Sequence, residues 1–351
     1  MIKRFSILFL MFIPVAVLGQ LPQTDLNWQL LWEDNFNGFN NDLWLKTNDC
    51  KHGYEPQLFV KNNVWVNDGK LIIRVNNDKT RCLEDFEEYS SCQECDTSLL
   101  YEYTSGRVET MPAYAIRFGY VEARIKVPHY DGLWPAFWTL IKQGLHHEDP
   151  GHSVSEIDIF EIYAHKAHSN LFNHLETNLH HVYNPSTEPP TAYLQEHDLK
   201  NFNYTDWHKY AIEWDPVKII WYVDDTPIRT TYNHGIMDSV RLIMNVAIVS
   251  DGQYWPETTP YFARHMLVDY VKTYSLNCNE QETIYEIPDF SVYDYSVKKY
   301  IKLGSGTTIP SGTNICLRAR NYIELLPGFE VPAEGKLYLD VSPCGTGNVN
   351  F

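Results

Sequence analysis

The amino-acid sequence predicts an all-β protein, a sandwich of two sheets followed by a small β module. From Leu30 onward, short runs rich in Val, Ile, Tyr, Trp and Phe are separated by turn residues, which is typical of strands. No long segment shows the apolar periodicity of a helix. Many antiparallel strands in a chain of 351 residues favour two sheets packed face to face.

The chain begins with a predicted secretory signal peptide, residues 1–19. Lys3 and Arg4 form a basic start, and the apolar stretch that ends at Val17 is too short to span a bilayer. Gln20 follows the expected cleavage site, and the lack of a cysteine there argues against a lipid anchor. No later stretch approaches transmembrane length. We therefore expect a secreted or cell-surface protein that is not inserted into the membrane.

The charge balance narrows the classes of partner. The formal net charge is −17, and it becomes more negative when Lys3 and Arg4 leave with the signal peptide. Such a charge argues against nucleic acid and against anionic membranes as partners. It also argues against a heavily sulfated substrate, unless a local basic patch outweighs the global charge.

The strands of the central region follow in order. Residues 64–66 and 71–75 flank an Asn-Asp-Gly turn, which predicts a tight hairpin. A second pair of strands is predicted on either side of Asp215-Pro216, at 210–214 and 218–223. Further strands are predicted at 118–127, 240–248 and 266–274. The composition changes near Cys278, so residues 277–298 are interpreted as a linker and residues 299–351 as a C-terminal β module in which 336–341 alternate.

Two polar insertions interrupt the strand pattern. Residues 76–99 contain Cys82, Cys92 and Cys95, and with Cys50 upstream they predict a loop braced by disulfides in an exported protein. A zinc site is the alternative, because Cys92 and Cys95 have ligand spacing. The chain has seven cysteines, so at least one thiol stays unpaired in a monomer. Residues 142–154 are rich in His and acids; we interpret them as solvated surface, with metal binding as the alternative.

One strand carries three carboxylates, Glu156, Asp158 and Glu161, spaced by Ile and Phe. Side chains alternate along a strand, so Glu156 and Asp158 share one face. Glu161 would fall on the apolar face, where an unpaired carboxylate is too costly. A β-bulge at Ile159 or Phe160 would add one residue and return Glu161 to the face of Glu156. A solvated strand face is the simpler alternative.

Three carboxylates on one face suit the hydrolysis of glycosidic bonds. In a retaining mechanism one carboxylate attacks the anomeric carbon and a second carboxyl group protonates the leaving oxygen. A third would position the nucleophile and raise the pKa of the acid. Trp134 and Trp138 lie at i and i+4 of one strand and could bind sugar rings. His180 shares a face with Asn178 and could bond the sugar or a carboxylate.

These residues resemble glycoside hydrolase family 16. The run Glu-Ile-Asp-Ile-Phe-Glu is similar to the bulged family signature E-x-D-x-x-E, and residues 134–138 match W-P-A-x-W. Further matches include Leu31-Trp32-Glu33-Asp34 at the opening strand and Asn245-Val246-Ala247 later in the chain. The similarity covers residues 26–276, which would form the catalytic domain.

The resemblance implies a concanavalin-like β-jelly roll that hydrolyses a β-linked polysaccharide internally and with retention. Glu156 would be the nucleophile, Asp158 its assistant and Glu161 the acid/base. Arg107, Trp134, Trp138 and His180 fall where family members line the cleft. No cofactor is expected for catalysis, and we expect a monomer.

Family members also suggest a structural calcium, for which the corresponding positions are Asn35, Gly69 and Asp269. Asn35 stands where the family usually has an acid. Calcium prefers charged oxygen ligands, so this substitution removes one anionic ligand from the expected site.

The expected substrate is a laminarin-like β-1,3-glucan, which suits the aromatic content and the W-P-A-x-W motif. A galactan hydrolase of the agarase, porphyranase or carrageenase type is the alternative. It would be favoured by a local basic patch formed by Lys142, His165, Lys166 and His168. A non-catalytic carbohydrate-binding protein is a third reading, because the same fold serves lectins. The C-terminal module resembles accessory modules of secreted Bacteroidota enzymes through its Glu-Leu-Leu-Pro-Gly-Phe-Glu-Val-Pro-Ala run, residues 324–333.

Overall fold

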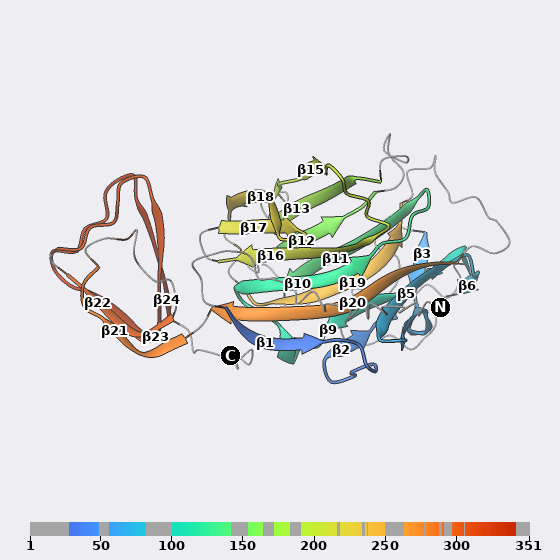
Figure 1. The fold of residues 1–351 in the computed structure, drawn as a ribbon, viewed down its shortest axis with the longest axis horizontal. Helices are drawn as coiled ribbons and strands as arrows, with labels where there is room; N and C mark the ends of the chain where they lie inside the picture. Colours follow the sequence, from blue (N-terminus) through green and yellow to red (C-terminus); the bar gives the residue numbers. More distant parts are fainter. Residues whose placement is uncertain are drawn as a thin grey trace, which may run out of the picture.

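The computed structural model describes a two-sheet β-sandwich beside a smaller four-stranded sheet (Figure 1). The described residues are 28–48, 56–81, 100–141, 154–163, 172–182, 191–215, 218–233, 236, 238–249, 263–276, 278–287, 290, 297–304 and 306–341. Within them the structure is nearly all strand, with two single-turn 3-10 helices, η1 (Lys61–Asn63) and η2 (Pro112–Tyr114). The expected all-β class is confirmed.

The larger sheet of the sandwich has ten strands. Its main path runs β18-β17-β16-β10-β20-β5-β8-β3, with β1 on β20 and β4 on β5. The bounds are β1 Trp28–Asp34, β3 Gln57–Phe59, β4 Val64–Asn67, β5 Lys70–Asn76, β8 Tyr103–Ser105, β10 Gly119–Lys126, β16 Trp207–Trp214, β17 Lys218–Val223, β18 Thr226–Tyr232 and β20 Ala263–Leu276.

The smaller sheet of the sandwich has eight strands and carries the candidate site. Its path is β14-β13-β12-β11-β19-β9-β2, with β15 on β13. The bounds are β2 Trp44–Lys46, β9 Arg107–Thr110, β11 Leu133–Ile141, β12 Val154–Glu161, β13 His174–Val182, β14 Thr191–Ala192, β15 Gln195–Asp198 and β19 Val240–Ile248. A short pair, β6 (Thr80–Arg81) and β7 (Leu100–Tyr101), stands apart.

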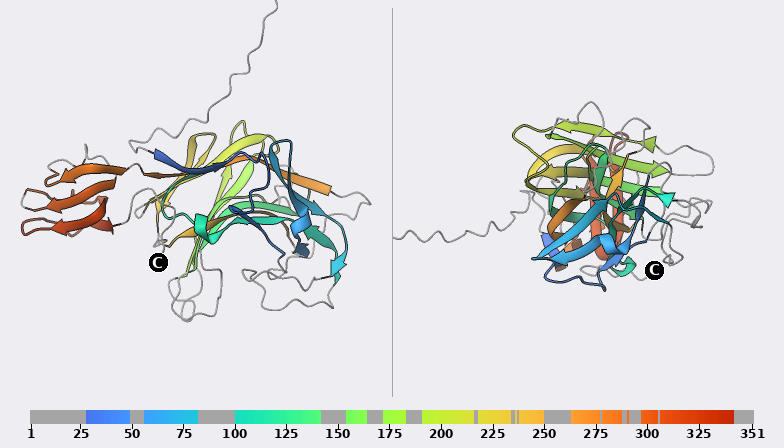
Figure 2. Two further views of the ribbon diagram at one scale, coloured as in Figure 1. Left: turned by 90° about the horizontal axis from the view of Figure 1, so that it is seen from below. Right: turned by 90° about the vertical axis from the view of Figure 1, so that its right-hand side faces the viewer.

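One continuous apolar core lies between the two sheets of the sandwich, as the layered views suggest (Figure 2). The smaller sheet contributes Phe137, Ile157 and Met244, and the larger sheet contributes Ile212 and Trp221, all fully buried. Since alternate residues of a strand face opposite ways, the positions between these core residues point to the outer face of the smaller sheet. The three carboxylates predicted for catalysis, Glu156, Asp158 and Glu161, lie on that face.

The turns form where the sequence predicts them. β4 and β5 pair with Asn67 opposite Lys70, and the two turn residues Asp68 and Gly69 both have positive φ, 49° and 66°. Positive φ at both central positions matches the right-handed twist of the strands, which is why Asp-Gly suits this hairpin. The predicted pair around Asp215 is present as β16 and β17.

The C-terminal sheet is parallel throughout, in the order β21-β22-β23-β24. The bounds are β21 Cys278–Ile284, β22 Val297–Leu303, β23 Asn314–Leu325 and β24 Lys336–Val341. Residues 278–284, interpreted above as linker, form a strand of this sheet. Their sequence is polar and does not alternate, so the strand depends on pairing with β22 and on contacts such as the ion pair of Lys298 with Glu282, 2.7 Å.

Several sequence-based expectations lie outside the described residues. They are the signal peptide, the cysteines at positions 50, 82, 92 and 95, most of the insertion at 142–154, and the basic patch at positions 142, 165, 166 and 168. Within the described ranges Cys316 is a free, buried thiol. No helix in those ranges is long and apolar enough to cross a membrane.

The strand β12 contains the bulge that the sequence predicts. Against β11, Phe137 faces Phe160 and Trp138 faces Asp158, so Ile159 is the extra residue. Ile159 and Phe160 are both buried in the core, while Asp158 and Glu161 face outward on either side of them. A bulge locally disrupts the hydrogen-bond ladder. Trp221 compensates from the opposite sheet, where its indole N–H donates to the backbone carbonyl of Asp158 at 2.8 Å.

Trp221→Phe tests whether this indole bond secures the bulge. Leaving the buried carbonyl of Asp158 without its donor is expected to cost about 1–3 kcal/mol of unfolding free energy. The matched control is Trp214→Phe, because the buried Trp214 indole nitrogen has no hydrogen-bond partner in the described ranges. Denaturant unfolding should show Trp221→Phe as the less stable variant. Equal losses of stability would contradict the anchoring role.

Candidate active site

The bulge gathers the three predicted carboxylates in one pocket on the outer face of the smaller sheet. The pocket has a volume of about 200 Å³. The residues that line it come from β3, β9, β11, β12 and β19, and they are Phe59, Arg107, Trp134, Ala136, Trp138, Glu156, Asp158, Glu161, Asn245 and Ala247. Six of the seven residues predicted for catalysis and substrate binding are therefore brought together, and the seventh, His180, contacts two of them from β13.

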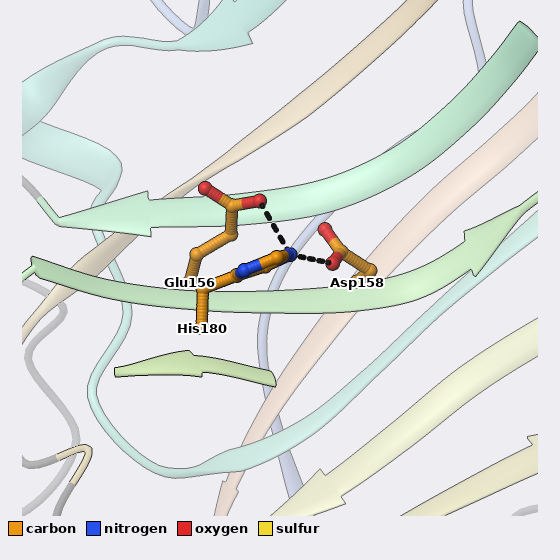
Figure 3. A group of neighbouring side chains, drawn as sticks. All are labelled: Glu156, Asp158 and His180. Atoms are coloured by element: carbon orange, nitrogen blue, oxygen red, sulfur yellow. Dashed lines mark ion pairs between the residues drawn. The ribbon is translucent and has the colours of Figure 1, made fainter. Parts of the chain in front are cut away.

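His180 faces the first two carboxylates from the neighbouring strand (Figure 3). Glu156 is the cross-strand partner of His180, which explains the approach. The Nε2 atom of His180 lies 3.7 Å from Glu156 Oε1 and 3.4 Å from Asp158 Oδ2, and Asn178 Nδ2 lies 2.9 Å from the same nitrogen. His180 is therefore placed to influence both carboxylates at once.

Glu156 and Asp158 are too close to ionise independently. Burial and the neighbouring Asp158 raise the pKa of Glu156 well above its ordinary value, and the two side chains share a hydrogen bond. Burial also raises the pKa of Asp158, whose side chain is almost inaccessible, and Glu161 adds to the effect. A negative charge on one of these two acids therefore opposes the ionisation of the other.

Glu161 has a different environment from the other two acids. Trp134 Nε1 donates to Glu161 Oε1 at 3.0 Å and the Tyr163 hydroxyl donates to the same oxygen at 3.3 Å. The rings of Trp134 and Tyr163 lie against each other with centroids 4.5 Å apart and are tilted by 30°. Burial raises the pKa of Glu161 to about 7, against the lowering effect of these hydrogen bonds. The group can therefore both hold and release a proton near neutral pH.

The floor of the pocket is fixed by a second set of contacts. Trp138 Nε1 donates to Asn245 Oδ1 at 2.7 Å, and the guanidinium of Arg107 lies 5.4 Å from the centre of the Trp138 ring. Arg107 also lies 3.8 Å from Glu109, which forms a buried ion pair with Arg241 at 2.9 Å. These contacts hold Trp138 and Arg107 in place against the cleft.

Two residues of the site are not indicated by the sequence pattern. Tyr163 follows the motif by two residues and lies beyond the end of β12, so no periodicity marked it. Asn245 belongs to a run that was noticed, but its role depends on the pairing of β19 with β11, which brings it beside Trp138.

Two of the three positions expected to hold calcium, Gly69 and Asp269, contact a lysine side chain. Lys70 Nζ lies 2.7 Å from Asp269 Oδ1 and 3.3 Å from the carbonyl oxygen of Gly69, and Arg124 contacts the other oxygen of Asp269 at 2.6 Å. Although burial opposes it, these two cations keep the pKa of Asp269 below its ordinary value. With Asn35 uncharged, the described side chains do not form a set of calcium ligands, because the Lys70 ammonium supplies the positive charge between Gly69 and Asp269.

Calcium is accordingly expected to leave thermal stability unchanged. Neither added Ca²⁺ nor a chelator should shift the Tm of the purified protein, and differential scanning fluorimetry is sufficient to measure it. Lys70→Gln should lower the Tm slightly, since a half-exposed ion pair contributes about 1 kcal/mol at most. A rise in the wild-type Tm with micromolar calcium would contradict the ammonium assignment.

Comparison with known proteins places this geometry in context. The sequence model of the glycosyl hydrolases family 16 matches residues 76–272. The glucan endo-1,3-beta-glucosidase A1 of Niallia circulans is 27% identical over 278 residues, which cover 70% of this chain and 37% of that protein. The beta-glucanase of Rhodothermus marinus is 28% identical over 310 residues, or 78% of this chain and 95% of that protein.

The fold agrees with these matches. The catalytic domain of a laminarinase from Thermotoga petrophila RKU-1 superposes with a TM-score of 0.56 at 23% identity, over 72% of this chain and 99% of that domain. The chain spans only about a third of the length of several curated relatives. The family match covers more than half of the chain, and the chain therefore belongs to the glycosyl hydrolases family 16.

Proposed function

We propose that the chain is a retaining endo-glycoside hydrolase that cleaves β-1,3-glucan. The observation that carries the proposal is the bulged strand β12, which presents Glu156, Asp158 and Glu161 to one pocket beside Trp134 and Trp138. Two of these carboxyl groups differ in the way that retaining hydrolysis requires. Glu161 holds a proton near neutral pH, and Glu156 lies on the same face with a neighbour that orients it.

In the first step Glu156 acts as the nucleophile. A carboxylate oxygen of Glu156 attacks the anomeric carbon, the glycosidic C–O bond breaks, and the proton of Glu161 passes to the leaving oxygen. In the second step Glu161 takes a proton from water, the resulting hydroxide attacks the same carbon, and the bond to Glu156 breaks. Two inversions at one carbon retain its configuration.

Asp158 and His180 are proposed to prepare Glu156 for attack. The shared hydrogen bond with Asp158 orients the Glu156 carboxyl group, and His180 lies within 4 Å of both acids. When charge moves from Glu156 to the sugar, the proton of the pair can settle on Asp158, whose burial favours its neutral form.

The sugar would be held by aromatic and polar side chains around these acids. Trp134 and Trp138 are half-buried, so part of each ring is accessible in the pocket. Trp134 also bonds Glu161. A sugar that contacts this ring would therefore lie beside the acid/base group.

The choice of β-1,3-glucan rests on two supports. The relatives named above include enzymes described as glucan endo-1,3-beta-glucosidase and laminarinase. The net charge of −17 disfavours a polyanionic galactan. Secretion or display at the cell surface and a monomeric state complete the proposal, the first from the N-terminal signal predicted above.

Activity assays decide between the candidate substrates. Reducing ends should appear with laminarin and not with agarose, porphyran or carrageenan. Glu156→Gln should lower kcat by a factor of at least about 10⁴, since removal of a nucleophile leaves little residual catalysis, while isothermal titration with laminari-oligosaccharides still detects binding. Asp158→Asn should reduce the rate less. Cleavage of a galactan in place of laminarin would redirect the substrate assignment, and near-normal activity of Glu156→Gln would refute the nucleophile.

The pH dependence follows from the state of Glu161. The first step needs Glu161 protonated, and its pKa is raised to about 7, so on the alkaline side of the profile kcat/KM falls as pH rises through that value. The alkaline limb of a kcat/KM profile on laminarin should therefore have its midpoint near pH 7. A limb near the ordinary value of a glutamic acid would contradict the acid/base assignment. Glu161→Gln should abolish the limb together with most of the activity.

A further inference from the structure

A row of three glutamates crosses the outer face of the smaller sheet. Glu161 on β12 pairs directly with Glu176 on β13, and Glu176 pairs with Glu196 on β15. Directly opposed residues on neighbouring strands point to the same face with Cβ atoms about 5 Å apart. The row therefore begins at the proposed acid/base and ends at an exposed glutamate.

The middle member of the row is hidden from solvent. Glu176 is 1% exposed and Glu161 is 7% exposed, whereas Glu196 is exposed. A buried carboxylate is costly unless it has partners. The buried carboxyl group of Glu161 beside Glu176 raises that cost further. Packing alone does not account for an acid at position 176.

His174 lies beside Glu176 on the same strand, two residues before it. Its Nε2 atom lies 3.8 Å from Glu176 Oε1, and its Nδ1 atom lies 2.8 Å from Asp198 Oδ1. Asp198 is the cross-strand partner of His174 and reaches solvent. His174 thus lies between the buried Glu176 and an exposed acid at the edge of the sheet.

Glu161 experiences the field of Glu176 together with several other groups. On its own strand it faces Asp158 and Glu156, from β13 it faces His180, and Tyr163 follows it in the chain. Glu176 opposes the loss of a proton from Glu161, and His180 favours that loss. Trp134 on β11 and Tyr163 contribute neutral donors.

We propose that Glu176 is a positioning residue for the reaction: its buried carboxylate, supported by His174, keeps the proton on Glu161 in the resting enzyme. The inference rests on the proposed function of Glu161 and assigns a role to the residue that lies opposite it on β13. A negative charge beside the acid makes ionisation of Glu161 unfavourable until the proton is transferred to the leaving oxygen. Glu176 contributes no bond to the sugar in this role.

The test is the pH profile of Glu176→Gln, which removes the charge and keeps the shape. The midpoint of the alkaline limb of kcat/KM should move down by about one pH unit, with little change on the acid side of the profile. Above the new midpoint the variant should fall behind the wild type by up to about tenfold. Glu196→Gln is the matched control, because it removes an exposed carboxylate from the same row and should leave the limb in place.

A second variant separates the electrostatic role from a structural one. His174→Gln removes the neighbour that balances the charge of Glu176, so the limb should move in the opposite direction, to higher pH. A variant that merely loosened the fold would lower the rate at every pH and move neither limb. An unmoved limb in both variants, with native circular dichroism and Tm, would overturn the proposal.

A failure of the proposed function can be distinguished from a failure of the coupling between Glu176 and Glu161. If the wild type cleaves none of the polysaccharides, the retaining-hydrolase proposal fails. The carboxyl ¹³C resonance of Glu161 can then be titrated by NMR in the wild type and in Glu176→Gln. A lower midpoint in the variant would support the coupling without any turnover, and equal midpoints would refute it.

Discussion

The single extra residue in β12 is the constraint on which the candidate site depends. Without Ile159 as a bulge, Glu161 would point into the core beside Phe160, where an unpaired carboxylate could not be accommodated. With it, both flanking apolar residues are buried and both acids face outward. The distortion is anchored from the other sheet by the Trp221 indole. The active-site geometry is thus stabilised by the core of the sandwich, and it would be lost if the two layers separated.

The same bulge creates the electrostatic character of the pocket. It brings Glu161 alongside Asp158 and next to Glu176 across the strand, so burial and like charge act together. Groups in such surroundings titrate jointly and retain protons at higher pH. Trp134, Tyr163 and His180 offset part of this effect with hydrogen bonds and partial charge. The balance leaves one acid able to give up a proton near neutrality, which is the property that general acid catalysis requires.

The sequence was sufficient for the parts of the molecule that depend on local patterns. Alternation and turn residues predicted the hairpins, and the misfit of Glu161 predicted the bulge, because both are properties of consecutive residues. The rest depended on register between distant strands. Nothing near Glu176 in the chain indicates that Glu161 lies opposite it, and nothing near Lys70 indicates that its ammonium meets Asp269. Strand β21 was missed for the same reason, since its polar residues become a strand only through pairing with β22.

The positions of the Arg and Lys side chains explain how the sandwich can hold many buried and partly buried acids. Buried or partly buried acids away from the pocket are matched with fixed positive charges: Glu109 with Arg241, Glu122 with Lys209, and Asp269 with Lys70 and Arg124. Glu161 instead accepts hydrogen bonds from an indole and a phenol group, and Asp158 lies beside an imidazole. A fixed cation would lower the pKa of Glu161 and release its proton before substrate arrived. The neutral donors Trp134 and Tyr163 also lower the pKa of Glu161, but burial outweighs them and keeps it at about 7, while the ion pairs elsewhere stabilise the scaffold.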